Sequence, residues 1–320
     1  MRVYRIFGLT VSSDLALPGI ATIDAAGDEG HRAADVRVRC ERWDDRGVGA
    51  RTTSVDARRR STSTVDVSLA LDVEHGVARL AVPGVAVFRV SGGREIRVSA
   101  EPRSKAADVR SWLLGSTFAL LLLQRRALPL HASAVELRGR AVLLCGPSGA
   151  GKSTLAAFFG ASGSRVISDD VSPIEISDDG LRIRPGIARV KLAREAAFAL
   201  AEDPSRLRAA DGPRAKLEWP IERPVDVPLP LAAIVHLRPE SASRMPELVR
   251  VEGPVSLALL ARSTYRRRFL HELGLDPWHF RACADIARST RSFEARYALG
   301  WDRLPDVVSW LSEELAVSCP

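Results

Sequence analysis

Short apolar runs separated by glycine and polar residues dominate the first hundred positions of the chain. Their alternation of apolar and polar residues is typical of β-strands. The predicted strands are Arg2–Phe7, Val36–Arg39, Val65–Val73, Val77–Val82, Val85–Val90 and Glu95–Ala100. Residues 44–64 are polar, which favours a loop. The pattern predicts a smaller, mostly β N-terminal domain over residues 1–104.

The pattern changes after residue 104. An apolar stripe predicts a helix from Val109 to about Arg126, with Asp108 as its N-terminal cap. We expect residues 105–128 to connect two domains. Strand and helix patterns alternate over residues 129–320, which is typical of an α/β domain. Its later helices are expected at Ala193–Glu202, Pro254–Arg262, Ser263–Leu273, Pro277–Ser289 and Leu304–Leu315.

Two hairpins are expected early in this α/β domain. Residues 130–137 and 141–145 are apolar runs on either side of Arg138-Gly139-Arg140, which favours a tight turn. Residues 174–176 and 181–184 flank Ser177-Asp178-Asp179-Gly180, so this aspartate pair is interpreted as part of a turn. Residues 231–237 form a further buried-strand pattern, and His236 within it is interpreted as a core residue.

The run Gly-Pro-Ser-Gly-Ala-Gly-Lys-Ser at 146–153, called the glycine-rich loop below, has the spacing of a phosphate-binding loop between a strand and a helix. Glycines let successive backbone N–H groups turn toward phosphate oxygens. Lys152 would reach the β- and γ-phosphates, and the Ser153 hydroxyl would bind Mg²⁺. The predicted nucleotide-binding residues are Gly146, Ser148, Gly149, Ala150, Gly151, Lys152, Ser153 and Thr154.

Two adjacent acids, Asp169 and Asp170, end the next predicted strand, sixteen residues after Ser153. Open α/β sheets place their ligand crevice at such strand ends. One carboxylate would bind the metal, and the other would accept a proton from an attacking hydroxyl. The residues alone leave open which aspartate does which. They also leave open a turn with two solvated acids.

His131 begins the strand that returns toward the glycine-rich loop, so hairpin pairing places it near the far end of residues 141–145. Histidine is suited to proton handling near neutral pH, and a structural histidine is the alternative. Arg189 and Lys191 follow the acid pair. We consider them as phosphate or substrate contacts, because cations stabilise a transferring phosphoryl group.

His131, the glycine-rich loop and the acid pair, with Leu-His-Ala-Ser-Ala-Val and Ile-Ser-Asp-Asp-Val around them, together resemble the catalytic domain of HPr kinase/phosphorylase and its wider group of HPr-kinase-like serine kinases. The resemblance implies an α/β P-loop kinase domain related to that of PEP carboxykinase. It also implies Asp169 as the base, Asp170 as its metal-binding or orienting partner, and His131 as a neighbour of both. The segment from Pro185 to Leu192 adds a softer match.

Two departures separate the chain from the bifunctional, HPr-specific subgroup. Thr154 stands where that subgroup has glutamate, and a Glu-Ile-Arg-Gly-Leu-Gly segment associated with phosphorolysis is absent from the sequence. The expected activity is therefore transfer of the γ-phosphoryl of ATP, with Mg²⁺, to a serine of a small protein or peptide. The acceptor's identity, and whether phosphorolysis also occurs, are left open.

Two other nucleotide-binding classes fit this sequence poorly. GTPases read the base with an asparagine-containing motif, and this sequence contains no asparagine. The Ser-Gly-Gly at 91–93 precedes the glycine-rich loop, whereas an ABC-type ATPase carries its signature after the loop. A nucleotide-binding sensor without transfer activity and a small-metabolite kinase remain as alternatives.

Composition adds outer limits. The formal net charge is +7, but the arginines are dispersed, so we expect no nucleic-acid partner. Four cysteines without a Cys-x-x-Cys pair disfavour a disulfide framework or zinc site. Because Asp14 and Pro18 interrupt the N-terminal apolar residues and the apolar run at 112–123 is short, we expect a cytoplasmic protein without membrane contact. A homo-oligomer is left open.

Overall fold

The structure is a computed structural model that describes residues 1–23, 34–42, 67–72, 75–201, 203–212, 215–240, 245–298, 300 and 303–319. The expected polar loop at 44–64 lies outside these residues. Contacts between Cα atoms divide the chain into two units. Unit 1 comprises Met1–Ala127, Asp211–Arg214 and Arg268–Asp276; unit 2 comprises Leu128–Ala210, Ala215–Arg267 and Pro277–Pro320. The domain boundaries expected from sequence remain a prediction.

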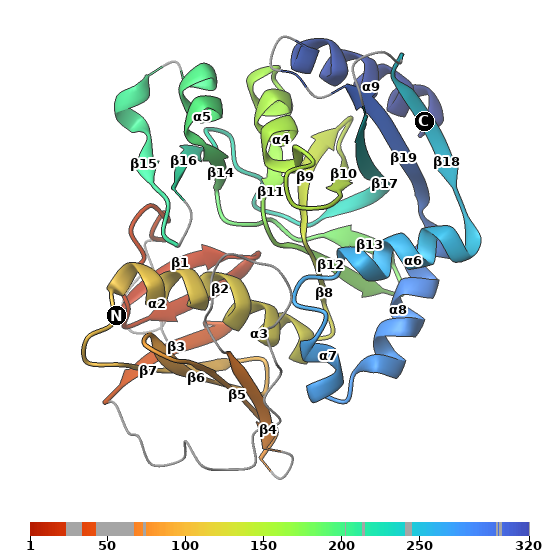
Figure 1. Ribbon diagram of the computed structural model, residues 1–320. Helices are drawn as coiled ribbons and strands as arrows, with labels where there is room; N and C mark the ends of the chain where they lie inside the picture. The colour runs from red at the N-terminus through yellow and green to blue at the C-terminus, as the bar shows by residue number, and fades with distance from the viewer. Residues whose placement is uncertain are drawn as a thin grey trace. The chain divides into compact units, whose positions relative to one another are not determined.

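Unit 1 is built on a seven-stranded sheet with the order β1-β2-β3-β7-β6-β5-β4 (Figure 1). The strands are β1 (Arg2–Ile6), β2 (Leu9–Ser13), β3 (Val36–Glu41), β4 (Ser68–Asp72), β5 (Val77–Val82), β6 (Ala86–Ser91) and β7 (Glu95–Ala100). Along β5 every second residue is buried, as expected for a strand with one face on a core. The sequence pattern predicted these strands except β2, which was missed although Leu9 and Val11 alternate with the polar Thr10 and Ser12.

The helical run of unit 1 consists of α2 (Ala106–Trp112), a π-helical turn η1 (Leu113–Thr117) and α3 (Phe118–Gln124). The expected Asp108 cap was wrong. The helix begins at Ala106 after Lys105, and Asp108 lies in the first turn, where a negative charge still interacts favourably with the helix dipole. A short α7 (Phe269–Glu272) also belongs to unit 1.

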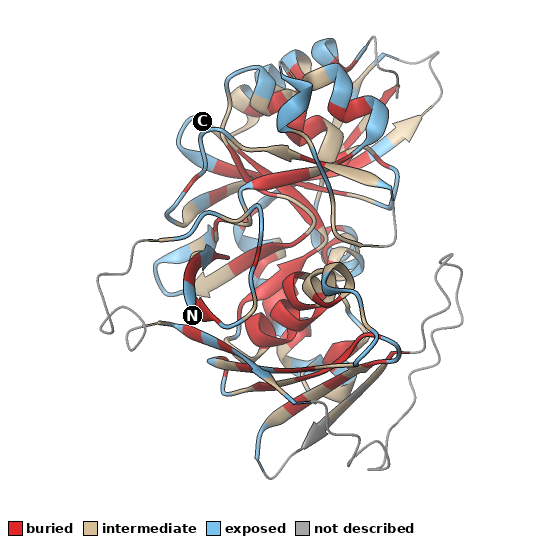
Figure 2. Ribbon diagram, turned by 90° about the vertical axis from the view of Figure 1, so that its left-hand side faces the viewer, coloured by how far each residue is buried: buried red, intermediate tan, exposed pale blue. Residues whose placement is uncertain are grey.

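The run Ala106–Gln124 is long and apolar enough to cross a membrane by length and composition alone, with a mean hydropathy of 1.3. In the structure, 61% of the 18-residue window that gives this hydropathy is buried, and every residue from Phe118 to Leu123 is buried (Figure 2). The rings of Phe7 and Phe118 lie 5.7 Å apart between centroids. This run therefore serves as a core helix of unit 1.

Unit 2 contains the glycine-rich loop and the acid pair. Its strands are β8 (Leu128–Leu130), β9 (Ala132–Leu137), β10 (Arg140–Cys145), β11 (Val166–Ser168), β12 (Ser172–Ser177), β13 (Gly180–Ile183), β14 (Arg189–Ala193), β15 (Arg208–Ala209), β16 (Lys216–Pro220), β17 (Leu229–Glu240), β18 (Glu247–Val251) and β19 (Arg291–Ala298). Its helices are α4 (Lys152–Ala161), α5 (Arg194–Leu200), a 3₁₀ turn η2 (Pro204–Arg206), α6 (Gly253–Ser263), α8 (Asp276–Ser289) and α9 (Leu304–Ser318).

Nine strands of unit 2 form one mixed sheet. Its path is β11-β9-β10-β17-β13-β12-β8, and β19 pairs with both β17 and β18. Strands β10, β17 and β19 run parallel to one another. Both predicted hairpins are confirmed, because β9 pairs antiparallel with β10 and β12 pairs antiparallel with β13. A separate three-stranded sheet has the order β14-β16-β15.

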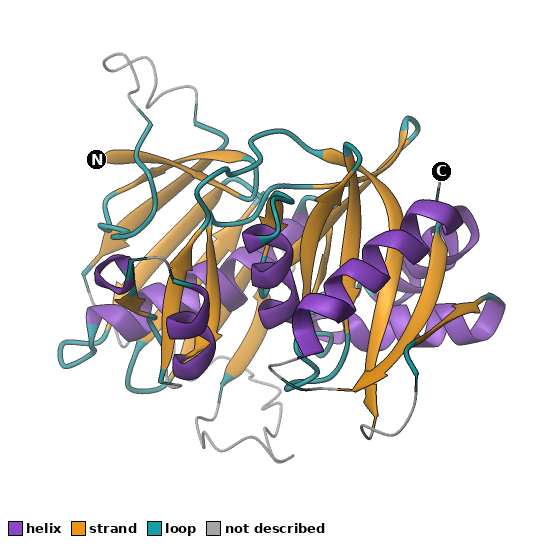
Figure 3. Cartoon of the chain, turned by 90° about the horizontal axis from the view of Figure 1, so that it is seen from above, coloured by secondary structure: helices purple, strands orange, loops and turns teal. Residues whose placement is uncertain are grey.

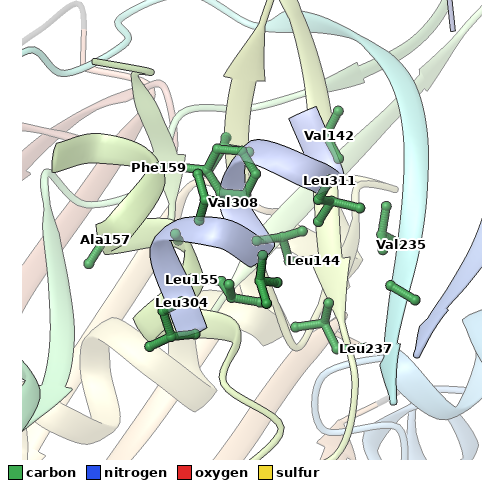
Figure 4. Packing of buried hydrophobic residues seen from close by; sticks show 14 of the residues in the cluster. Val142, Leu144, Leu155, Ala157, Phe159, Val235, Leu237, Leu304, Val308 and Leu311 are labelled. Atoms are coloured by element: carbon green, nitrogen blue, oxygen red, sulfur yellow. The ribbon is translucent and has the colours of Figure 1, made fainter. Parts of the chain in front are cut away.

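Helices cover both faces of the nine-stranded sheet (Figure 3), and the alternation along β10 divides its side chains between two cores. Val142 and Leu144 face α4 and α9, where they meet Leu155 and Leu311 (Figure 4). The alternate side chains Ala141, Leu143 and Cys145 belong to the core that also contains residues of α6 and α8. Full burial of one such Val or Leu contributes about 1.5–3 kcal/mol. The loop after β10 thus leaves a rigid strand.

One helix expected from sequence was wrong. Residues 263–273 do not form a continuous helix, because the backbone after α6 pairs with strand β8 instead. Thr264 forms a β-bridge with Leu130, and the Tyr265 N–H donates to the Pro129 carbonyl over 2.8 Å. These bonds satisfy backbone groups that a helix would otherwise have used.

Candidate functional site

The glycine-rich loop joins β10 to α4 in a conformation that requires glycine. Gly146, Gly149 and Gly151 have φ values of 149°, 89° and 89°, in the region that side-chain-bearing residues rarely adopt. Gly146 also packs closely, because a Cβ atom there would lie 3.0 Å from the Leu237 carbonyl oxygen of β17. The loop is therefore set against its neighbouring strand.

The remaining loop residues lie around the start of α4. Ser148 is exposed, Ala150 is buried, and Ser153 and Thr154 are half-buried in the first turn of the helix. The Tyr297 hydroxyl of β19 donates to the Ala150 carbonyl over 2.9 Å, which ties the glycine-rich loop to the sheet. The positive end of the α4 dipole meets the loop, as in anion-binding sites at helix N-termini.

Lys152 lies against the loop. Its ammonium donates to the carbonyls of Gly146 and Pro147 over 2.9 and 3.1 Å, and the residue is only 7% exposed. Burial lowers the pKa of Lys152, whereas the charges of Asp169 and Asp170 act in the opposite direction. The acid pair is thus close enough to the loop lysine to interact with it electrostatically.

Sheet pairing explains why the acids and the loop meet. Strand β9 pairs antiparallel with both β10 and β11, so β10 and β11 are parallel and end at the same edge. Cys145 at the end of β10 lies opposite Ala132, and Ser168 at the end of β11 lies opposite Ala134. His131, directly before β9, therefore lies at this edge too.

Asp169 is held from two elements. Its Oδ1 accepts a hydrogen bond from the Ser133 hydroxyl of β9 over 2.7 Å, and its Oδ2 accepts one from the Lys191 backbone N–H of β14 over 3.0 Å. Ser133 is fully buried. Hydrogen bonds to an ionised carboxylate are stronger than neutral ones and fix its orientation.

Asp170 has a different environment. It adopts a left-handed φ of 68°, which aspartate tolerates better than most residues. His131 Nδ1 donates to the Asp170 carbonyl over 3.1 Å and lies 3.4 Å from its Oδ1. Burial would raise the pKa of Asp170, but the hydrogen bond and charge of His131, with the charges of Lys191 and Lys216, lower it to about 2.

Arg189 and Lys191 lie on the same strand but in different surroundings. Arg189 is 6% exposed and forms a 2.5 Å ion pair with Glu218 of β16, so its charge is compensated inside the protein. Lys191 is half-buried, and its charge acts on Asp170. The structure brings Lys191 to the acid pair and gives Arg189 a structural ion pair. A substrate contact by either residue remains a prediction.

Two residues of the site were missed or underrated from sequence. Ser133 lies within Leu-His-Ala-Ser-Ala-Val, and its hydroxyl has significance only once β9 lies beside β11. Lys216 lies far from the acid pair in sequence, and only the pairing of β16 with β14 brings it there. One signal was present, because lysine is rare in this chain.

Metal binding at this edge would need groups from outside the protein. Among the described residues, no group of three or more His, Cys, Asp or Glu side chains is arranged to hold a metal ion. The donors that lie here, the Ser153 hydroxyl and the Asp170 carboxylate, are oxygens, which Mg²⁺ prefers. Mg²⁺ usually completes its coordination with water and substrate phosphates. The donor set therefore fits a magnesium ion that arrives with a nucleotide.

A hollow of about 220 Å³ lies away from this edge, where α4 ends and β11 begins. Its lining includes Gly160, Ser164, Arg165, Trp219 and Arg223. None of the glycine-rich loop residues or the two aspartates lines it, so it is separate from the candidate site.

Comparisons with known proteins give little beyond this geometry. No family model and no curated protein matches the chain. Among solved structures, the fold is similar to that of the Hpr(Ser) kinase/phosphatase from Coxiella burnetii, with a TM-score of 0.34 and 12% sequence identity over 59% of this chain and 91% of that chain. These values indicate at most a distant fold relationship within a mixed α/β architecture.

Proposed function

We propose that this chain is an ATP-dependent kinase that transfers the γ-phosphoryl group to the serine hydroxyl of a small protein or peptide. The observation that carries the proposal is that β10 and β11 are parallel, so the glycine-rich loop and the acid pair follow strand ends on the same side of the sheet. A phosphate cradle and two carboxylates at one strand edge are the parts that phosphoryl transfer needs, because its catalysis is mostly positioning and electrostatics.

The environments of the two acids support different roles. A carboxyl group with a pKa of about 2 holds a proton weakly, so Asp170 suits a permanently ionised metal ligand or orienting group. Asp169 is fixed by Ser133 and the Lys191 backbone, and a carboxylate has lone pairs left for a serine hydroxyl. Asp169 is therefore the proposed base.

The chain's residues would then act together in one displacement. The loop N–H groups and Lys152 bind the phosphates of ATP, and Ser153 and Asp170 hold Mg²⁺, which when bound neutralises charge on the phosphate oxygens. The serine oxygen of the acceptor forms a bond to the γ-phosphorus while the bond to the bridging oxygen of ADP breaks. Asp169 takes the serine proton. His131 orients Asp170 through its Nδ1–H.

The proposal is tested with labelled ATP, Mg²⁺ and serine-containing acceptor peptides. Asp169→Asn should abolish transfer while nucleotide affinity stays largely unchanged, because the variant loses the base and keeps the cradle. Lys152→Ala should weaken both transfer and binding. The exposed pair Asp178 and Asp179 in the turn after β12 offers matched controls, and Asp178→Asn should behave as the wild type.

The outcomes separate the alternatives. Label on serine that depends on Asp169 supports the kinase. Nucleotide binding without any acceptor-dependent transfer indicates a sensor or regulatory protein. Transfer only to low-molecular-weight hydroxyl compounds indicates a small-metabolite kinase, and transfer retained in Asp169→Asn refutes this residue as the base.

A further inference from the structure

Lysine is rare in this chain, and most of its lysines lie near one another in the structure. Of 46 basic residues only Lys105, Lys152, Lys191 and Lys216 are lysines. Three of these four lie at the candidate site, on α4, β14 and β16. In a composition that supplies arginine almost everywhere else, this distribution indicates that the site requires the ammonium group itself.

Lys191 and Lys216 form a connected pair, called the lysine pair below. Strands β14 and β16 are antiparallel neighbours, with Ala193 opposite Lys216 and Lys191 opposite Glu218. The Lys216 ammonium donates to the Lys191 carbonyl over 3.1 Å, and the backbone N–H of Lys191 donates to Asp169. Lys191 thus connects Lys216 to the proposed base, Asp169.

The charges of the lysine pair reach the reacting region. The Lys216 ammonium binds the carbonyl of Lys191, and the backbone N–H of that same residue binds Asp169, so Lys216 lies beside the acid pair. Its charge also acts on Lys152 of the glycine-rich loop. A group between them, such as a terminal phosphoryl, would lie in the field of all three ammonium groups.

The lysine pair also differs from the neighbouring arginine. Arg189 is neutralised by Glu218, whereas neither Lys191 nor Lys216 forms an ion pair with a carboxylate among the described residues. Both are half-buried, where a charge is screened less than at the surface. Lysine is a compact point charge with three rotatable donors, while the arginine guanidinium is a rigid planar fork. Compact cations suit a small, moving phosphoryl group.

We propose that the lysine pair binds the transferring phosphoryl group on the side of the acid pair, while Lys152 binds the nucleotide phosphates from the opposite side. The inference rests on the proposed kinase function and adds Lys216 to its machinery. The pair would contact the γ-phosphoryl of ATP and, after transfer, the same group on the acceptor. ADP lacks this phosphoryl group.

The test compares affinity for ADP with affinity for ADP plus beryllium fluoride, which mimics a terminal phosphoryl group, both in the presence of Mg²⁺. In the wild type we expect tighter binding of the beryllium fluoride complex. Lys191→Met and Lys216→Met should keep the ADP affinity and each lose about tenfold to hundredfold of the affinity for the complex, the value of a charge-assisted hydrogen bond. Lys105→Met, which removes the exposed fourth lysine at the start of α2, is the control and should match the wild type.

The readout distinguishes two failures. A wild type that binds neither ADP nor the complex sinks the proposed kinase function. If the wild type prefers the complex and the lysine variants keep that preference, only the role of the lysine pair is overturned. The same holds if the variants lose affinity for ADP and for the complex equally. Folding is checked by thermal unfolding, and Lys191→Gln and Lys216→Gln, which preserve side-chain length and polarity, replace any methionine variant that does not fold. The same affinities decide the outcome.

Discussion

At the scale of single residues, two adjacent aspartates have different hydrogen-bond partners. Asp169 is bound by the Ser133 hydroxyl and a backbone N–H, whereas Asp170 faces His131 and remains 42% exposed at its side chain. Neighbouring carboxylates repel each other unless cations compensate, and the surrounding lysines supply that compensation. Adjacent positions in sequence therefore need not share a chemical role.

The low pKa of Asp170 predicts a pH dependence of stability. A carboxyl group whose folded pKa is lowered stabilises the native state above its unfolded pKa of about 4, and this contribution disappears as the pH falls through about 2. The free energy of unfolding of Asp170→Asn should therefore lie below that of the wild type near pH 5. The gap should narrow as the pH falls from about 4 to about 2. Urea unfolding at several pH values measures it, and a gap that widens on acidification contradicts the proposed environment.

At the scale of elements, strand β11 owes its position to the segment that precedes β14. The Gly186 N–H donates to the Ile167 carbonyl over 2.7 Å, and a Cβ at position 186 would lie 2.6 Å from the Cβ of Ser168. Ser168 directly precedes the acid pair. Only glycine allows the segment to approach the strand this closely, so Gly186 positions both aspartates.

Gly186→Ala should therefore disturb the acids. We expect a loss of about 1–3 kcal/mol in unfolding free energy, as for other overpacked cores, and a fall in transfer rate larger than the unfolded fraction explains. Thermal unfolding and transfer assays on the same sample measure the two effects.

Gly160→Ala is the matched control. A Cβ there would meet the Trp219 ring and the Val166 side chain at 3.1 Å, at the C-terminal end of α4 and the start of β11, whereas the acid pair follows the end of β11. It should change stability without changing the transfer rate per folded molecule. Equal transfer rates in both variants would show that Gly186 has no positioning role.

At the scale of the whole molecule, the cysteines report on both units. Cys40 is exposed in unit 1 and Cys319 is partly exposed in unit 2, while Cys145 and Cys283 are buried in the core beneath α6 and α8. Burial raises the pKa of each buried thiol to about 12. Thiols react as thiolates, so burial and a raised pKa both protect Cys145 and Cys283. The pKa of the exposed Cys40 is also raised, by partial burial and by the charge of Asp14, so its exposure is what makes it reactive.

Alkylation of the native protein near pH 8 should consequently modify Cys40 and Cys319 within minutes and leave Cys145 and Cys283 unmodified. Mass spectrometry of peptides identifies the sites, and the unfolded protein, in which all four should react, is the control. Rapid labelling of Cys145 in the native protein would contradict the placement of β10 within the sheet.

The sequence by itself determined the local elements of this protein. The glycine spacing of residues 146–153, the apolar run before it and the turn at Gly139 are local patterns, because backbone freedom and two-residue periodicity act over a few positions. They predicted the hairpin of β9 and β10, the loop and the start of α4. The same local reasoning failed at Asp108, which is not the helix cap. It also failed at residues 263–273, where pairing with β8 decided the backbone conformation.

Only the tertiary structure decided which side chains share the site. Ser133, Lys191 and Lys216 come from three strands and Asp169 directly follows a fourth, and nothing in their spacing shows that β9 lies beside β11 or that β14 lies beside β16. The tertiary structure also gives Arg189 and Lys191 different roles, because Glu218 neutralises Arg189 and not the lysine two residues later. The physical reason is that strand pairing and burial join residues far apart in the chain, and the charge a residue presents depends on the neighbours it acquires there.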